Sequence, residues 1–201
     1  MKKPPELFSS QLKRWLDSKQ PKTIASISDV FGKKTFTIAI LLLMLFPALP
    51  IPTGGITHVL EVAVMLLSLE MIAGLGVVWL PKKLKNQSLG QLAQKKIIPF
   101  FYNKIVWVEK RSRPIGGFIM NNKEVSRLSG LFLLVMAVLA FLSPPFSGLD
   151  TIPSLAAVLI CLGIIFEDIR IYIFGCLAAI ASLAIVIFFG AVITEFIYHL
   201  F

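Results

Sequence analysis

Two long apolar segments of the chain are each interrupted by a cluster of helix-breaking residues. Residues 46–55 read FPALPIPTGG, and residues 142–153 read LSPPFSGLDTIP. Proline lacks a backbone donor and clashes with the preceding helical turn, and glycine favours conformations outside the helix, so no regular helix should continue through either cluster. The residues expected to form these helix-break turns are Pro47, Pro50, Pro52, Gly54, Gly55, Pro144, Pro145 and Pro153. Each apolar segment is therefore expected to form two helical arms joined by a break.

The composition of the chain is typical of an integral membrane protein. Of its 201 residues, 56% are hydrophobic and only 15% are charged, whereas soluble domains carry about 25% charged residues. The apolar residues gather in three blocks, at residues 36–80, 128–166 and 171–198. The first 35 residues are polar and basic, so no cleavable signal peptide is expected. The chain is predicted to form a single all-α membrane domain over residues 1–201.

The basic residues lie beside the apolar blocks rather than inside them. Eight of the twenty Lys and Arg residues precede the first block, eleven lie in the linker at residues 82–127, and Arg170 alone stands apart. Basic flanks mark the cytoplasmic side of a membrane segment and attract anionic lipid head groups. The net charge of +9 therefore predicts a membrane partner, and nucleic acid is not expected to bind. The N-terminus and the linker are expected to be cytoplasmic in a multi-pass protein of the bacterial inner (plasma) membrane.

Two cytoplasmic flanks require the apolar block between them to enter the membrane and return. This predicts a first broken hairpin at residues 36–81 and, by the same reasoning, a second broken hairpin at residues 128–169. The charged sequence FEDIR then marks a cytoplasmic turn, and residues 170–201 are long and apolar enough to form a C-terminal transmembrane helix.

The two hairpins also indicate an internal repeat. Shifting the sequence by 97 positions, the separation of Pro47 and Pro144, keeps the apolar residues in register. The same shift aligns Thr57 with Ser154 and Glu70 with Glu167. Because each unit starts from a basic segment, two hairpins of the same orientation are favoured. The alternative is an inverted pair of broken helices, each crossing once, which would place the linker outside.

Two polar stretches carry apolar residues at helical spacing, the N-terminal segment at residues 1–35 and the linker. Amphipathic basic helices of this kind either lie on the membrane surface or cap the helix bundle from the cytoplasmic side, and both interpretations stay open. The apolar positions are Phe8, Leu12, Trp15 and Leu16 in the first stretch and Phe101, Ile105 and Val108 in the second.

A few polar residues lie inside the apolar arms, where an ionisable group costs roughly 2.5–3.5 kcal/mol and usually marks a pathway or a packed polar site. At about 100° per residue, Thr57, Glu61 and Ser68 share one helical face. The candidate polar pathway comprises Thr57, Glu61, Ser68, Glu70, Ser154, Glu167 and Asp168. The alternative is structural, with Thr57 and Ser154 as helix caps and with Glu167 and Asp168 in a charged turn. For Glu61, buried polar packing and a functional role both stay open, and Glu61 is the residue predicted to carry the function of such a pathway.

An enzymatic role is not expected. The chain has two His residues far apart and two Cys residues inside apolar segments, which predicts neither a metal site nor a disulfide. No phosphate-binding GxxxxGK motif and no GxSxG nucleophile motif occurs. We therefore predict no catalytic residue, no metal and no cofactor.

Three stretches closely resemble the ExoD family of bacterial exopolysaccharide-synthesis membrane proteins: FGKKTFTIAILLLMLFPALPIPTGG, LPKKLKNQSL and LSPPFSGLDTIPSLAAVLICLGIIFED. The resemblance covers residues 27–190 and includes Gly32, the proline-rich turn, the WLP sequence at residues 79–81, Gly163 and Asp168. It implies an inner-membrane protein linked to exopolysaccharide production, and it brings no catalytic residue set.

Two functions are compatible with these features. The first is a small transporter or channel-like protein for an ion or solute, with a polar path through Glu61. The second is a non-catalytic scaffold or accessory subunit of the exopolysaccharide machinery, whose partners would be polysaccharide-export proteins, anionic lipids and further copies of the chain.

Overall fold

A computed structural model describes residues 7–23, 26, 34–49, 56–75, 98–113, 115–120, 122–143 and 149–200, apart from the side chains of 56, 99 and 190–200. Within these ranges the chain forms eight helices and no strand, which confirms the predicted all-α class. The helices are α1 (Phe8–Asp17), α3 (Thr35–Met44), α4 (Ile56–Ala73), α7 (Ile98–Arg111), α8 (Gly117–Met120), α9 (Lys123–Leu142), α10 (Thr151–Phe166) and α11 (Ile169–Leu200).

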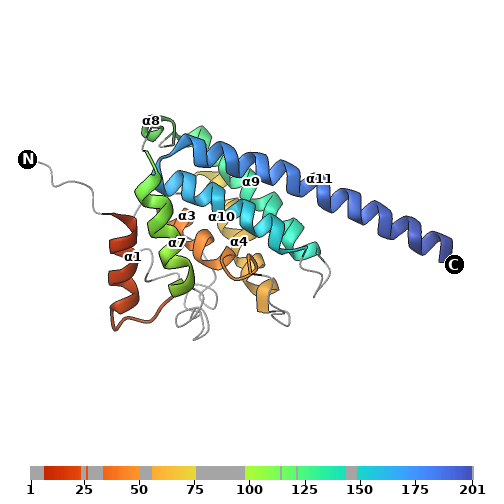
Figure 1. The fold of residues 1–201 in the computed structure, drawn as a ribbon, viewed down its shortest axis with the longest axis horizontal. Helices are drawn as coiled ribbons and strands as arrows, with labels where there is room; N and C mark the ends of the chain where they lie inside the picture. The colour runs from red at the N-terminus through yellow and green to blue at the C-terminus, as the bar shows by residue number, and fades with distance from the viewer. Residues whose placement is uncertain are drawn as a thin grey trace, which may run out of the picture.

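Helix α10 lies at the centre of the bundle. It packs against α3, α9 and α11, while α4 packs against α3 and α9. In Figure 1, α9, α10 and α11 run side by side in alternating directions, and α11 extends beyond the others towards the C-terminus. The helices of each predicted hairpin, α3 with α4 and α9 with α10, are therefore in contact with each other and with the other pair.

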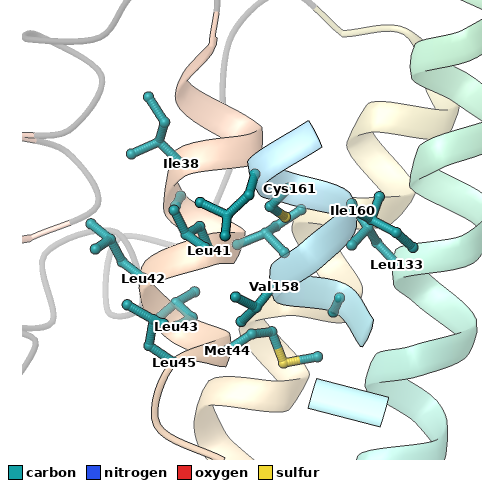
Figure 2. Packing of buried hydrophobic residues seen from close by; sticks show 14 of the residues in the cluster. Ile38, Leu41, Leu42, Leu43, Met44, Leu45, Leu133, Val158, Ile160 and Cys161 are labelled. Atoms are coloured by element: carbon teal, nitrogen blue, oxygen red, sulfur yellow. The ribbon is translucent and has the colours of Figure 1, made fainter. Parts of the chain in front are cut away.

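Helix α3 is buried on every side. All ten of its residues are buried, and none is charged, as suits a helix at the centre of a packed structure. Figure 2 shows Leu41 and Met44 of α3 beside Val158 of α10, and Leu133 of α9 beside Ile160. At about 1.5 Å per residue, α3 is only about 15 Å long, half the thickness of a hydrocarbon core. Its position therefore depends on packing against its neighbours.

Two glycines allow α10 and α11 to approach closely. A Cβ atom at Gly163 would lie 2.5 Å from the amide nitrogen of Tyr172, and one at Gly175 would lie 2.6 Å from the amide nitrogen of Ile160. No real Cβ atom makes contacts this short with a backbone, so these two positions fix how the helices meet. Small residues have this role at many helix contacts in membranes.

Two of the helices in the described ranges are long and apolar enough to cross a bilayer. They are α9 and residues 169–189 of α11, with mean hydropathies of 2.2 and 2.6. Only 33% and 17% of their most apolar windows are buried, whereas the core helix of a soluble protein is mostly buried. The exposed side chains on α11 include Phe174, Leu177 and Ile180. Length, composition and exposure favour association with a membrane.

Helix α1 directs its apolar side towards the protein. Phe8, Leu12 and Trp15 are buried, and the ring of Phe8 makes an edge contact with Phe166, with 6.2 Å between ring centroids. The amide of Ser9 donates hydrogen bonds of 3.3 Å to both carboxylate oxygens of Glu109 in α7. These contacts agree with a helix that caps the bundle, and contact with a membrane surface stays a prediction.

One end of the bundle, which we call the basic end, gathers the start of α3, the end of α4, the start of α9 and the junction of α10 with α11. Lys34 lies 3.0 Å from a carboxylate oxygen of Glu167, and the guanidinium of Arg127 lies beside Gly74. At the opposite end, which we call the break end, the ring of His58 at the start of α4 packs against Phe141 near the end of α9, 5.2 Å between ring centroids. Both helix pairs therefore leave the basic end and return to it.

The start of α9 and the position of Pro153 differ from the sequence expectations, and several predicted turn residues lie outside the described part of the chain. Helix α9 begins at Lys123, inside the predicted linker, because Asn122 caps it by accepting a hydrogen bond of 3.0 Å from the amide of Glu124. Pro153 lies in the first turn of α10, where its missing amide proton is not needed. Pro47 lies in a turn after α3. The other predicted turn residues, Pro50, Pro52, Gly54, Gly55, Pro144 and Pro145, lie outside the described residues.

Candidate functional site

The structure separates the predicted polar pathway into two groups. Thr57, Glu61 and Ser154 lie near the break end, at the starts of α4 and α10. Glu167 and Asp168 lie at the basic end, beyond the last turn of α10. Ser154 and Glu167 are thirteen residues apart along α10 and its end, which corresponds to about 20 Å. The two groups therefore do not form one site.

Glu61 is the most deeply buried acid of the break end. Its side chain is 0% exposed, and its Oε2 lies 3.1 Å from Nδ1 of His58, one helical turn earlier. Its other oxygen, Oε1, is buried without a hydrogen-bond partner among the described residues. A buried carboxylate oxygen without a partner is costly and uncommon in folded proteins, so Glu61 differs from an acid retained for packing.

His58 connects this buried acid to the surface. Its side chain is 37% exposed, and its ring is held between Glu61 and Phe141. The charge of Asp150, the residue before α10, acts on both Glu61 and His58. The starts of α4 and α10 thus bring two acids and one histidine close enough to interact electrostatically.

The remaining polar residues of the predicted path extend along the buried side of α4. Thr57 and Ser68 are 3% and 0% exposed and are buried like Glu61 on the same helix. The hydroxyl of Ser68 has no hydrogen-bond partner within the described part of the chain. Ser154 differs, because its hydroxyl donates to the carbonyl of Asp150 at 2.7 Å and so supports the first turn of its own helix.

The acids of the basic end have structural contacts. Glu167 ends α10 in a left-handed conformation, φ 56°, and the amides of Glu167 and Asp168 donate to the carbonyls of Ile164 and Gly163. This is the hydrogen-bond pattern of a Schellman motif.

Glu70, on the predicted path near the end of α4, is also buried.

Asp168 caps α11 and ties the linker to it. Its side chain is 1% exposed and accepts hydrogen bonds from the amide of Arg170 at 3.0 Å, the guanidinium of Arg170 at 3.1 Å and the amide of Arg113 at 2.8 Å. Burial alone would raise the pKa of Asp168, but these hydrogen bonds and the charge of Arg170 outweigh burial and lower the pKa to about 2. The predicted charged turn is therefore a structural clamp.

The described residues provide no obvious metal centre. Within them, no three His, Cys, Asp or Glu side chains gather closely enough to hold a metal ion. Cys161 is buried and Cys176 is half-buried, and both are free thiols.

The family of the chain is shown by comparison with known proteins. The model of the family described as "Exopolysaccharide synthesis, ExoD" matches residues 8–188, from α1 to the exposed part of α11. The chain belongs to the ExoD family. The match begins earlier than the predicted resemblance, because it includes the helix that caps the basic end.

Two known proteins are similar to this ExoD-family chain. It is 27% identical to Protein ExoD of Rhizobium meliloti (strain 1021) over 150 residues, which cover 73% of this chain and 61% of that protein. It is 23% identical to Uncharacterized protein slr1875 of Synechocystis sp. (strain ATCC 27184 / PCC 6803 / Kazusa) over 176 residues, 85% of this chain and 82% of that protein. The chain thus aligns with about three fifths of the length of the Rhizobium relative. No solved structure matches.

Sequence reasoning identified Glu61 in this ExoD-family protein but did not identify its partner. The signal for the His58 contact was the spacing of three residues, which places two side chains on neighbouring positions of one helix. The signal for Asp150 was weaker, because its closeness to Glu61 depends on the packing of two helices that are far apart in the sequence. No local pattern indicated the hydrogen bond between Arg113 and Asp168.

The clamp at Asp168 predicts a specific dependence of stability on pH. The pKa of Asp168 in the folded protein is about 2, below its usual value of 3.8, so the stabilisation by the ionised carboxylate is complete above about pH 4 and is lost as the pH falls towards 2. We expect Asp168→Asn to lower the free energy of unfolding at pH 7 by about 1.5–3 kcal/mol, because charge-assisted hydrogen bonds are weakened.

Thermal unfolding of the purified protein in detergent, followed by circular dichroism between pH 7 and pH 2, measures both effects. The wild type should lose more stability between pH 4 and pH 2 than Asp168→Asn does. Glu124→Gln, at an exposed acid that pairs with Arg127, is the control and should behave like the wild type. Parallel pH profiles for the wild type and Asp168→Asn would contradict the clamp.

Proposed function

We propose that this ExoD-family protein is a multi-pass protein of the bacterial inner membrane that moves a small ion or solute in support of exopolysaccharide production. The family description supports the link to exopolysaccharide synthesis. The observation that supports transport is Glu61, an acid that is 0% exposed, has one unpartnered oxygen and touches a half-exposed histidine. The proposal includes no catalytic step and no cofactor.

The two ends of the bundle supply the proposed orientation. Lys34, Arg113, Arg127 and Arg170 lie at the basic end, beside α1 and α7, which suits the cytoplasmic face and its anionic lipids. The break end then faces outwards, with both predicted breaks near that side. Contact between the two helix pairs agrees with two hairpins of the same orientation.

The proposed path follows the buried side of α4. It starts at His58, which reaches the surface at the break end, and continues through Glu61 to Ser68. Polar groups on one buried side of a helix are costly in a membrane protein unless they line a pathway or a packed polar site. The ion pairs and backbone contacts of the basic end would close the path in the resting state.

Topology tests the orientation. In a background with Cys161→Ser and Cys176→Ser, Lys110→Cys on α7 should react with a membrane-impermeant maleimide only from the cytoplasmic side. Leu142→Cys at the end of α9, 68% exposed, should react only from the outside. Intact cells and inverted membrane vesicles provide the two sides. Labelling of Lys110→Cys in intact cells would contradict the proposal and favour the inverted arrangement.

Flux through liposomes tests transport. Vesicles that contain the purified full chain should pass at least one species from a panel of H⁺, Na⁺, K⁺, Cl⁻ and small sugars faster than empty vesicles. Glu61→Gln should slow that flux by about tenfold or more, because the group that binds the moving species is lost. Glu124→Gln is the control, since it removes an exposed acid of α9 that lies outside the path. Flux through Glu61→Gln equal to that of the wild type would exclude Glu61 from the path.

A scaffold function is the second candidate, and a groove between α1 and α7 favours it. The groove has a volume of about 720 Å³ and combines two cations with several hydroxyl groups and one acid. It is lined by Ser10, Lys13, Arg14, Asp17, Ser18 and Tyr102. An open surface of this kind suits an acidic partner such as a segment of an export protein or a lipid head group.

Reversal of charge in the groove tests the scaffold function. Lys13→Glu combined with Arg14→Glu should release export proteins that co-purify with the wild type after gentle solubilisation. Lys123→Glu, outside the groove, is the control and should keep them. Absence of any co-purifying export protein with the wild type would contradict this function.

A further inference from the structure

Only one of the two carboxylate oxygens of Glu61 has a hydrogen-bond partner among the described residues. Its Oε2 is satisfied by His58, whereas its Oε1 is buried without a partner in the described part of the chain. An ionised carboxylate accepts several hydrogen bonds, and a protonated one becomes a donor with fewer acceptor sites to fill. Binding of a positive species, which removes the negative charge, would therefore lower the cost of burying the unpartnered oxygen.

The surroundings of Glu61 favour a proton as that species. Calcium takes six or more oxygen ligands, and magnesium requires six oxygens in an octahedron. Val64 and Leu67, which follow Glu61 on α4, are apolar and fully buried. No group of three His, Cys, Asp or Glu ligands exists within the described residues. A proton needs only one carboxylate oxygen.

We infer that Glu61 is a proton-binding residue and that His58 passes protons between Glu61 and the outer solution. This inference rests on the proposed transport function and specifies its substrate. The 3.1 Å separation of Glu61 Oε2 and His58 Nδ1 is a hydrogen-bond distance, short enough for direct transfer. His58, with 37% of its side chain exposed, can exchange protons with water.

The transfer step is a simple proton exchange. The O–H bond on Oε2 of the Glu61 carboxylic acid breaks and an N–H bond forms on Nδ1 of neutral His58, which leaves a carboxylate beside an imidazolium. The imidazolium then releases the proton on Nε2 to water and becomes the neutral Nδ1–H tautomer. Uptake from the outer side follows the same steps in reverse, and no other reactant is needed.

The ionisable groups described around Glu61 come from α4 itself and from the start of α10. His58 is on the same helix as Glu61, and Asp150 at the start of α10 adds a negative charge that acts on both. From α9, the contact to His58 is the ring of Phe141. Helix α3, which packs against α4, contains no ionisable residue.

Proton flux into liposomes of the full chain, driven by a potassium diffusion potential and followed by a pH-sensitive dye, tests the inference. The wild type should acidify the lumen, Glu61→Gln should reduce the initial rate by about tenfold or more, and Glu124→Gln, at an exposed acid of α9, should leave it within about twofold of the wild type. His58→Ala should slow the flux, and added imidazole should restore it, because a small base can occupy the exposed position. A purely structural role of His58 would not respond to imidazole.

A second measurement does not depend on flux. The infrared spectrum of the wild type should show a protonated carboxyl band that disappears at high pH and is absent from Glu61→Gln; thermal unfolding checks that the variants fold. If Glu61→Gln fails to fold, the imidazole response of His58→Ala decides the matter. Flux of Na⁺ or K⁺ through Glu61 without proton flux would overturn the inference and leave transport standing. Absence of flux for every species would overturn both.

Discussion

The bundle depends on the turn between α10 and α11, because this turn ties separate parts of the chain together. Glu167 has a left-handed backbone, which costs a residue other than glycine roughly 1–2 kcal/mol. Its carbonyl accepts a hydrogen bond of 3.0 Å from the amide of Gly116, and its carboxylate pairs with Lys34. Asp168 adds the hydrogen bond from Arg113. These ties offset the strain and hold α3, the linker and α11 at one end.

This arrangement determines where a functional site can lie. At the basic end, the described ion pairs and hydrogen bonds join α3, the linker and the turn between α10 and α11. The break end has fewer such contacts among the described residues, and there an acid is buried with an unpartnered oxygen. Buried polar groups without a structural partner are expected mainly at functional sites. The contrast between Asp168, which accepts three hydrogen bonds described above, and Glu61, which has one, separates the structural acid from the functional candidate.

Sequence patterns predicted those parts of the fold that depend on local chemistry. Apolar runs predicted α3, α4, α9, α10 and α11, and helical spacing predicted the buried side of α1 at Phe8, Leu12 and Trp15. Helix ends were less predictable, because a single cap such as Asn122 can start a helix in a charged segment. The contacts between distant residues could not be predicted, since a hydrogen bond such as that from Arg113 to Asp168 depends on packing. For the same reason the site could be predicted at Glu61 but not at Asp150.

Under the predicted repeat, the two hairpins differ at the positions of the candidate site. The shift of 97 positions places Glu61 on Val158 and His58 on Leu155. Val158 is buried in the apolar core beside α3, and Leu155 is exposed. The second hairpin therefore carries apolar residues where the first carries the buried acid and its histidine. It contributes a negative charge from Asp150 and the packed surface of α10 instead. A path built on Glu61 would then run along the first hairpin, one path for each chain, with the second hairpin as its apolar support.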